Sequence, residues 1–204
     1  MNWHDRYTQQ ARWTEDLRKY LFEKAGLTGA QRILEAGCGT GAVLSSINTS
    51  AAVYGLDISA GALSEARIHA PGAKLVRGDA LVLPHPDATF DITFCHFLLL
   101  WVSDPLQAVR EMARVTRPGG SVLALAEPDH ARRVDKPESL APLGRLQAEA
   151  LRRQGADPSF GARLADTFLR AGIELIEAGT LQKSEEEAPR GEREIEWAVL
   201  EADL

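Results

Sequence analysis

The chain has 204 residues, of which 45% are hydrophobic and 25% charged, and its formal net charge is −6. This composition excludes disordered, collagen-like and disulfide-scaffolded proteins, and the length predicts a single domain over residues 1–204. The longest apolar run, residues 94–102, has about half the length of a membrane-spanning helix, so no membrane association is expected. The charge is uneven, +1 over residues 1–172 and −7 from residue 173 onward. Neither part has the basic excess that nucleic-acid binding requires.

The two cysteines, Cys38 and Cys95, form no CxxC pair and no His/Cys cluster. Their spacing therefore predicts no metal site and fits a reducing compartment. The polar N-terminus has no signal-peptide core, and together these features predict a cytoplasmic protein.

Short apolar runs alternate with helical patterns along the chain. An amphipathic helix is expected from Asp5 to Gly26, within an N-terminal cap over residues 1–26. Five strands are predicted at residues 32–36, 52–56, 74–77, 91–95 and 121–126, with helices at 41–48, 60–69 and 105–116. Ser59 and Asp104 are the expected N-caps of the second and third of these helices.

Strands separated by helices predict right-handed crossovers and a parallel sheet covered on both faces. The fold class is therefore α/β, a Rossmann-like, doubly wound and mostly parallel sheet. In such folds ligands bind beyond the carboxyl ends of the strands. Residues 138–154 are predicted as an added helix that caps the pocket, followed by a helix at 161–171, a sixth strand at 173–181 and a helix at 192–204.

The sharpest motif is ILEAGCGTGA, residues 33–42, an apolar strand and an acid followed by three glycines. Glycines at such a turn allow the backbone to approach a ligand closely, which indicates a nucleotide-like cofactor. With Asp57 twenty residues after Gly37, the motif also fits a loose dinucleotide fingerprint. A dinucleotide-dependent oxidoreductase therefore stays an alternative.

Three further motifs extend this pattern: GDA at 78–80, LPHPDATFDITFCHFLLLWVSDP at 83–105 and RVTRPGGSVLALAEPD at 114–129. With them the chain resembles, over about residues 7–181, the class I S-adenosylmethionine-dependent methyltransferases of the small-molecule methyltransferase-domain type. The resemblance implies S-adenosylmethionine as cofactor and methyl transfer to an O, N or C atom of a small molecule. A non-catalytic module that only binds the cofactor is a further alternative.

The resemblance also implies the cofactor-binding residues. Glu35 faces the methionine amino group, Asp57 accepts the ribose hydroxyls, and Asp79 lies at the adenine amino group. The full expected set is Tyr7, Trp13, Glu35, Gly37, Cys38, Gly39, Thr40, Gly41, Asp57, Ile58, Ser59, Asp79, Ala80, Leu81, Cys95 and His96.

Methyl transfer from a sulfonium is an in-line displacement, so alignment alone can supply much of the catalysis. If the acceptor is a hydroxyl or an amine, a base within hydrogen-bond reach helps. The catalytic candidates are His96, after the fourth strand, and His130, after the fifth, where Glu127 and Asp129 also lie. His96 can instead line the cofactor, and Trp13 can belong to the core instead of the lid.

Two expectations concern the ends of the strands. Relatives of this type finish with a sixth strand and an antiparallel seventh, and EREIEWAVLEADL, residues 192–204, does not look like that seventh strand. An unpaired edge on the fifth strand is therefore expected, and with it a homodimer through the C-terminal edge. Cys38 and Cys95, at the carboxyl ends of neighbouring strands, are expected to approach each other as reduced thiols.

Overall fold

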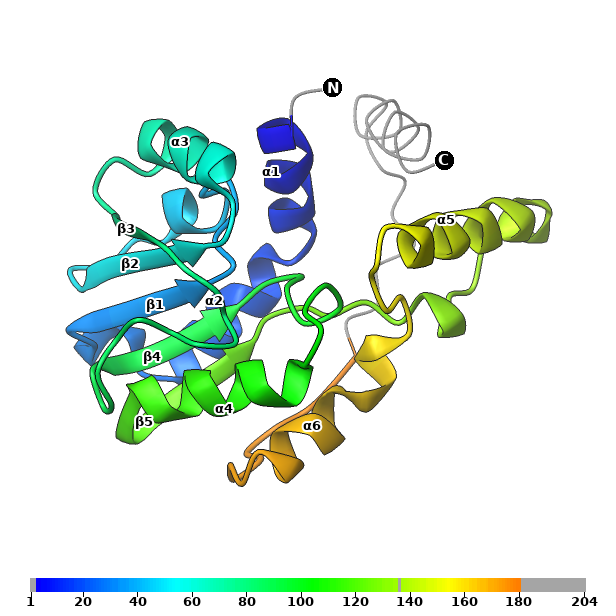
Figure 1. Ribbon diagram of the computed structural model, residues 1–204. Coiled ribbons are helices and arrows are strands. Elements are labelled where there is room, and N and C mark those ends of the chain that lie inside the picture. The colour runs from blue at the N-terminus through cyan, green and yellow to red at the C-terminus, as the bar shows by residue number, and fades with distance from the viewer. Residues whose placement is uncertain (1–2, 136, 181–204) are drawn as a thin grey trace.

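A computed structural model describes residues 3–135 and 137–180 (Figure 1). Its strands are β1 (Arg32–Ala36), β2 (Ala52–Asp57), β3 (Lys74–Arg77), β4 (Phe90–Cys95) and β5 (Thr116–Ala124). Its α-helices are α1 (Trp3–Trp13), α2 (Glu15–Lys24), α3 (Ala60–His69), α4 (Pro105–Val115), α5 (Ala141–Arg153) and α6 (Leu164–Arg170). Short 3-10 turns lie at Leu27–Gly29, Leu44–Ser46, His130–Arg132, Glu138–Leu140 and Phe160–Arg163.

The five strands form one parallel sheet in the order β3-β2-β1-β4-β5, as the alternating pattern predicts. Two core clusters cover it. One contains Ala108 and Met112 of α4 with Phe168 of α6, and the other contains Phe22 of α2 with Leu63 of α3. The doubly wound α/β prediction is thereby confirmed.

Several helices and strands begin and end where the local sequence signals predict. β1, β3 and α3 have the predicted bounds, and α3 begins at its expected cap, where the Ser59 hydroxyl accepts from the Ala62 N–H at 3.2 Å. The Asp104 carboxylate likewise accepts from the Gln107 N–H at 3.0 Å and caps α4. β5 begins earlier than expected, at Thr116, and its pairing with β4 is irregular before Ser121.

Three predicted elements differ from the structure. The N-terminal helix is broken at Thr14 into α1 and α2. Residues 41–48 do not form a helix beyond the turn Leu44–Ser46, because the chain leaves Gly41 with a φ of +80°. Residues 173–180 contain no strand, and position 181 and the predicted helix at 192–204 lie outside the described residues.

The helix predicted at 138–154 is present as Glu138–Leu140 and α5, and α5 lies beyond the carboxyl edge of the sheet (Figure 1). The chain after α5 is hydrogen-bonded to both neighbouring loops, since the Asp157 N–H donates to the Leu100 carbonyl and the Pro158 carbonyl accepts from the His130 N–H, both at 2.7 Å. Among the described helices, none is long and apolar enough to cross a membrane.

Candidate functional site

The carboxyl ends of β1 and β4 lie side by side at the point where the strand order reverses. In doubly wound sheets, this switch point is where the crevice for a ligand forms. Helix α1 stands over this edge of the sheet (Figure 1). The predicted site residues nearest to this point are those at the carboxyl end of β1.

The loop after β1 is a backbone turn built on three glycines. Gly37, Gly39 and Gly41 all have positive φ, at +72°, +52° and +80°. The N–H groups of Gly37 and Cys38 donate to the Leu56 carbonyl at 2.8 and 2.9 Å, which ties the loop to β2. A side chain at Gly37 would collide with Leu98, because a Cβ there would lie 2.6 Å from the Leu98 Cδ1. The loop therefore needs glycine for its backbone conformation, and a side chain at Gly37 would also require Leu98 to move.

Asp57, the last residue of β2, holds this loop from the other side. Its Oδ2 accepts from the Gly39 N–H and its Oδ1 from the Ser59 N–H, both at 2.8 Å. A carboxylate oxygen can accept more than one hydrogen bond, so both oxygens keep acceptor capacity for the hydroxyls of a ligand.

Glu35 is a buried carboxyl at the carboxyl end of β1, only 2% exposed. Its Oε2 has no hydrogen-bond partner among the described residues. Burial raises the pKa of Glu35 to about 8, with Asp57 adding to the rise and Arg18 opposing it. A buried carboxyl with a free oxygen is costly unless a ligand completes it, so Glu35 fits a cationic group.

Helix α1 covers the glycine loop. The ring of Tyr7 lies 3.7 Å from the position that a Cβ on Gly39 would take. The His4 Nδ1 and the Thr40 hydroxyl are 2.9 Å apart, and the His4 ring stacks on His69 of α3 with 3.3 Å between centroids. These contacts make α1 a lid over the predicted cofactor loop.

Trp13, the last residue of α1, is 37% exposed and so does not belong to the core. The adenine-side candidates follow the carboxyl ends of β2 and β3. Ile58 is 65% exposed, Ala80 is buried, and the Asp79 carboxylate accepts from the Leu81 N–H at 2.9 Å. Asp79 and Ile58 are therefore open to a ligand at this edge.

His96 follows β4 and contacts the junction of the two N-terminal helices, with its Nε2 2.9 Å from the Thr14 hydroxyl. Burial, with a smaller effect of the Arg18 charge, lowers the pKa of His96 to about 3. The ring is therefore neutral and a weak base, which favours the lining role over general-base catalysis.

Glu127, after β5, braces the loop that follows β4. Its Oε1 accepts from the N–H groups of Leu98 and Leu99 at 2.9 and 3.0 Å, and its Oε2 from that of Leu100 at 3.2 Å. Burial nevertheless raises the pKa of Glu127 to about 7. Since the carboxylate is occupied by three backbone donors, its place in the site is to position this loop.

His130 lies in the turn His130–Arg132, on the chain that leads from β5 toward α5, where its backbone N–H bonds to Pro158. Of the two catalytic candidates, His96 thus contacts Thr14, at the junction of α1 and α2, and His130 contacts the chain that follows α5. Within the described residues, no group of three or more His, Cys, Asp or Glu side chains is arranged to hold a metal ion.

The two cysteines are free, and each belongs to a different core cluster. The Cys38 Sγ lies 2.9 Å from the position that a Cβ on Gly55 would take, whereas the Cys95 Sγ lies 3.8 Å from the Glu127 Oε1. The Cys38 thiol thus lies against β2 and the Cys95 thiol against the chain after β5, and the approach of the two thiols to each other stays a prediction.

The sequence analysis missed two site residues, Thr14 and Arg18. Both are buried, at 2% and 5% exposure. The Arg18 guanidinium donates to the Ala11 carbonyl and, at 2.7 Å, to the Thr14 hydroxyl. Their spacing of four residues, continued by the buried Phe22, was the available signal, because it places Arg18 on the inner face of the helix.

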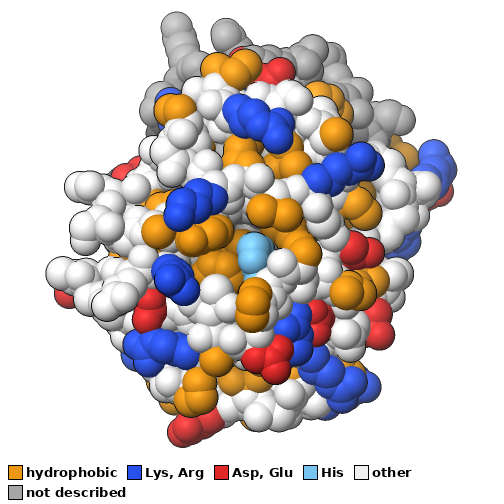
Figure 2. Space-filling view, turned by 60° about the vertical axis from the view of Figure 1, so that its left-hand side comes forward, with side chains coloured by type: hydrophobic (Ala, Val, Ile, Leu, Met, Phe, Trp, Pro, Cys, Tyr) orange, Lys and Arg blue, Asp and Glu red, His pale blue; other side chains and the backbone are white. Residues whose placement is uncertain are grey.

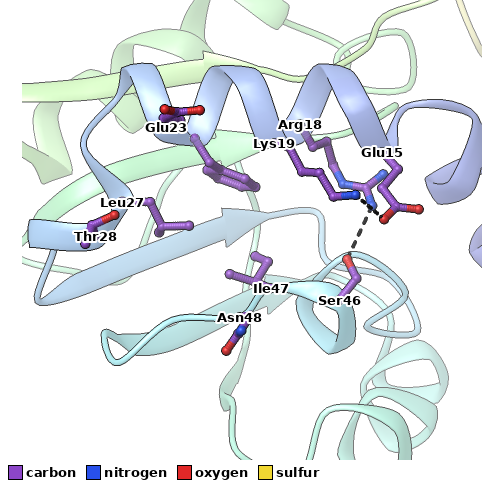
Figure 3. A pocket seen from close by; sticks show the side chains of 10 residues that line it. Glu15, Arg18, Lys19, Glu23, Leu27, Thr28, Ser46, Ile47 and Asn48 are labelled. Carbon is purple, nitrogen blue, oxygen red and sulfur yellow. Dashed lines mark hydrogen bonds and ion pairs between the residues drawn. The ribbon is translucent and has the colours of Figure 1, made fainter.

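A groove of about 270 Å³ lies beside this site, between α2 and residues 46–48 (Figure 3). Its apolar lining includes Phe22, Leu27 and Ile47, and none of the predicted cofactor-binding residues lines it. Arg18 extends from α2 across the groove to the Ser46 hydroxyl, at 3.3 Å.

Comparison with known proteins agrees with this geometry. Residues 34–124, which run from within β1 to the end of β5 and contain the glycine loop and Asp57, match the family model of the methyltransferase domain. This match supports a class I S-adenosylmethionine-dependent methyltransferase domain over residues 34–124, and S-adenosylmethionine is the cofactor of this class.

Two curated methyltransferases are similar to part of this chain. Demethylmenaquinone methyltransferase from Shouchella clausii is 35% identical over 126 residues, covering 57% of this chain and 52% of the relative. Ubiquinone biosynthesis O-methyltransferase from Vibrio cholerae is 37% identical over 109 residues, covering 50% and 44%. The chain spans about half the length of these curated relatives.

The solved structures agree in fold. The crystal structure of a SAM-dependent methyltransferase from Thermotoga maritima has a TM-score of 0.62 at 22% identity, covering 85% of this chain and 78% of that one. At this identity the likeness concerns the fold alone.

Proposed function

We propose that this protein transfers a methyl group from S-adenosylmethionine to a small molecule. The observation that carries the proposal is the buried Glu35 carboxyl, with its unpartnered oxygen, at the carboxyl end of β1 beside the glycine loop. A dinucleotide carries phosphates at this loop, and a buried acid suits an ammonium group better than a phosphate.

The residues fit the cofactor along the edge of the sheet. Glu35 would accept from the ammonium group, Asp57 from the ribose hydroxyls, and Asp79 would lie at the adenine. The backbone of the glycine loop allows the close approach that the ligand needs, and Tyr7 of the lid would cover it. The remaining expected members of the set are Trp13, Gly37, Cys38, Gly39, Thr40, Gly41, Ile58, Ser59, Ala80, Leu81, Cys95 and His96.

When bound, S-adenosylmethionine supplies an electrophilic methyl group on a sulfonium. The part of this chain is to align an acceptor with that group and to exclude water, which can lower the barrier by as much as about 7 to 11 kcal/mol. Glu127 contributes by holding the loop after β4, and neutral His96 contributes by lining the site. His130 stays the proposed base for an acceptor that has to lose a proton.

The acceptor is proposed to be a small molecule. Demethylmenaquinone and precursors of ubiquinone, which the names of two relatives indicate, are the first compounds to test. On the face that Figure 2 shows, Lys and Arg side chains are dispersed among acidic and hydrophobic ones, which does not favour nucleic acid as the substrate.

The test is calorimetric titration with S-adenosylhomocysteine and, in parallel, with NAD. We expect micromolar binding of the first only. Asp57→Ala should weaken it tenfold or more, because a charged acceptor contributes about 1.5 to 3 kcal/mol, whereas Asp16→Ala, which removes an exposed carboxylate of α2, should leave it unchanged.

Binding of NAD alone, or equal affinities of the two variants, would refute the cofactor assignment. Turnover of labelled methyl groups with the quinone precursors then separates an enzyme from a module that only binds. Failure to transfer a methyl group to any of a broad set of small molecules would favour the binding module.

We further propose that the protein works in the cytoplasm and forms a homodimer through the C-terminal edge. Two free cysteines fit a reducing compartment. Among the described strands, β5 forms an edge of the sheet, and such edges favour pairing with another chain. Sedimentation equilibrium tests the dimer, and a monomer at all concentrations would contradict it.

A further inference from the structure

Arg18 is a buried cation whose hydrogen-bond partners are all neutral. Its acceptors are the Ala11 carbonyl and the hydroxyls of Thr14 and Ser46. Arg18 is only 5% exposed. Nevertheless, none of the ion pairs among the described residues includes it. Buried charges are normally paired, so this guanidinium lacks an anion.

Hydrogen bonds connect the Arg18 guanidinium to the residue that follows β4 at the switch point of the sheet. The guanidinium is near enough to Glu35, at the end of β1, to oppose the rise of that pKa, and to His96, after β4, to lower the pKa there. It also reaches His96 through a shared partner, the Thr14 hydroxyl. Arg18 thus stands at the same crevice as the free carboxyl oxygen of Glu35.

A buried cation without an anion and a buried carboxyl without a cation are complementary to one chemical group, a zwitterionic α-amino acid. We propose that Arg18 binds the carboxylate of the methionyl end of S-adenosylmethionine while Glu35 binds its ammonium group, an inference that rests on the proposed function. Guanidinium and carboxylate form strong charge-assisted hydrogen bonds, and Arg presents donors in a planar fork that suits them.

The arrangement accounts for two otherwise costly features. The free protein keeps a charged guanidinium and an incompletely hydrogen-bonded carboxyl in its interior without an ion pair between them, and the ligand would supply a partner to both. The same guanidinium also caps the last turn of α1, because it donates a hydrogen bond to the Ala11 carbonyl there. Binding of the carboxylate would therefore also hold the lid in place.

The test compares S-adenosylmethionine with its decarboxylated form, which keeps the ammonium group and lacks only the carboxylate. Isothermal titration calorimetry measures the ratio of the two dissociation constants. We expect the wild type to prefer S-adenosylmethionine tenfold or more. Arg18→Met should reduce the preference to less than about threefold, and Arg18→Lys should retain part of it because it keeps the charge.

Lys19→Met is the matched control, since Lys19 is exposed next to Arg18 and pairs with Glu15 at 2.8 Å (Figure 3). This control should keep the full preference. If Arg18 only supports the helix junction, Arg18→Met will weaken both ligands equally and leave the ratio unchanged, which overturns the proposal. Two further results would each overturn the proposal, even where Arg18→Met does not fold. One is a ratio of the two dissociation constants in Arg18→Lys that equals the wild-type ratio, and the other is a wild type that shows no preference. If the wild type binds neither ligand, the proposed function itself fails.

Discussion

Two arginine–glutamate pairs in this molecule are built very differently. Arg114 of α4 donates to both carboxylate oxygens of Glu111 at 2.8 Å, to the carbonyls of Leu83 and His85 at 2.9 Å and to Asp87. The Leu83 N–H donates in turn to Glu111 at 2.8 Å. In this pair, the charges of both partners are satisfied, and the hydrogen bonds from Arg114 hold the pKa of Glu111 below its usual value.

Arg18 and Glu35 are more deeply buried and less complete. Glu35 has a free oxygen, its pKa is raised to about 8 by burial, and Arg18 binds neutral groups instead of it. The first pair lies away from the switch point and holds the chain between β3 and β4 to α4. The second lies where β1 and β4 meet. A satisfied pair stabilises the fold, whereas an unsatisfied pair at a crevice indicates a binding site.

The largest effect on stability is expected when the hydrogen-bonded pair of Arg114 and Glu111 is removed. Arg114→Met should lower the free energy of unfolding by about 2 to 3 kcal/mol, because it leaves the Glu111 carboxylate and two carbonyls without their donor. The loss is smaller than for a fully buried pair, since 32% of the Arg114 side chain is exposed. Urea denaturation measures it, with the exposed Arg110→Met on the same helix as control. Equal stabilities of the two variants would contradict a structural role for the pair.

The second effect concerns pH. A folded-state pKa of about 8 for Glu35, against an ordinary 4.5, means that its contribution to stability is complete below 4.5 and is lost as the pH rises toward 8. Relative to Glu35→Gln, the wild type without ligand should therefore lose about 1 kcal/mol between pH 6 and pH 7. Glu127 titrates in both proteins and cancels in this difference.

Urea denaturation at each pH measures the effect. Glu23→Gln, which changes an exposed carboxylate of α2, should follow the wild type at every pH. If the curve for Glu35→Gln is also parallel to that of the wild type, Glu35 is ionised throughout and the comparison of the two pairs fails. A Glu35→Gln protein that does not fold would show that the acid is structural.

The smallest effect concerns the lid. Tyr7→Ala should weaken S-adenosylhomocysteine about threefold to fivefold, because it removes the ring that lies against Gly39. Tyr7→Phe keeps that ring and should bind as the wild type does in the same calorimetric assay. A loss that is equal in both variants would point to the hydroxyl instead of the ring.

The sequence predicted those parts of the fold that depend on neighbouring residues. The strand at Lys74–Arg77 and the helix at Ala60–His69 have the expected bounds, since alternation and an N-cap are local signals. The helix expected through Thr14 is broken where Thr14 contacts His96, a residue distant in sequence. The strand expected from Ile173 is absent over residues 173–180, because a strand needs a neighbour to pair with and the apolar pattern alone does not supply one.

For the candidate site, the sequence by itself determined the order of the elements, the glycine loop and the acids near the carboxyl ends of β1 and β2. A turn with positive φ and an acid at the end of a strand are set within a few residues. Only the tertiary structure decided that Arg18 and His96 share the Thr14 hydroxyl, that the Glu127 carboxylate holds the loop after β4, and that the two cysteines belong to different core clusters. These features depend on how α2 and the chain after β5 pack on the sheet, and pairing and burial set the charge of a group only once that packing exists.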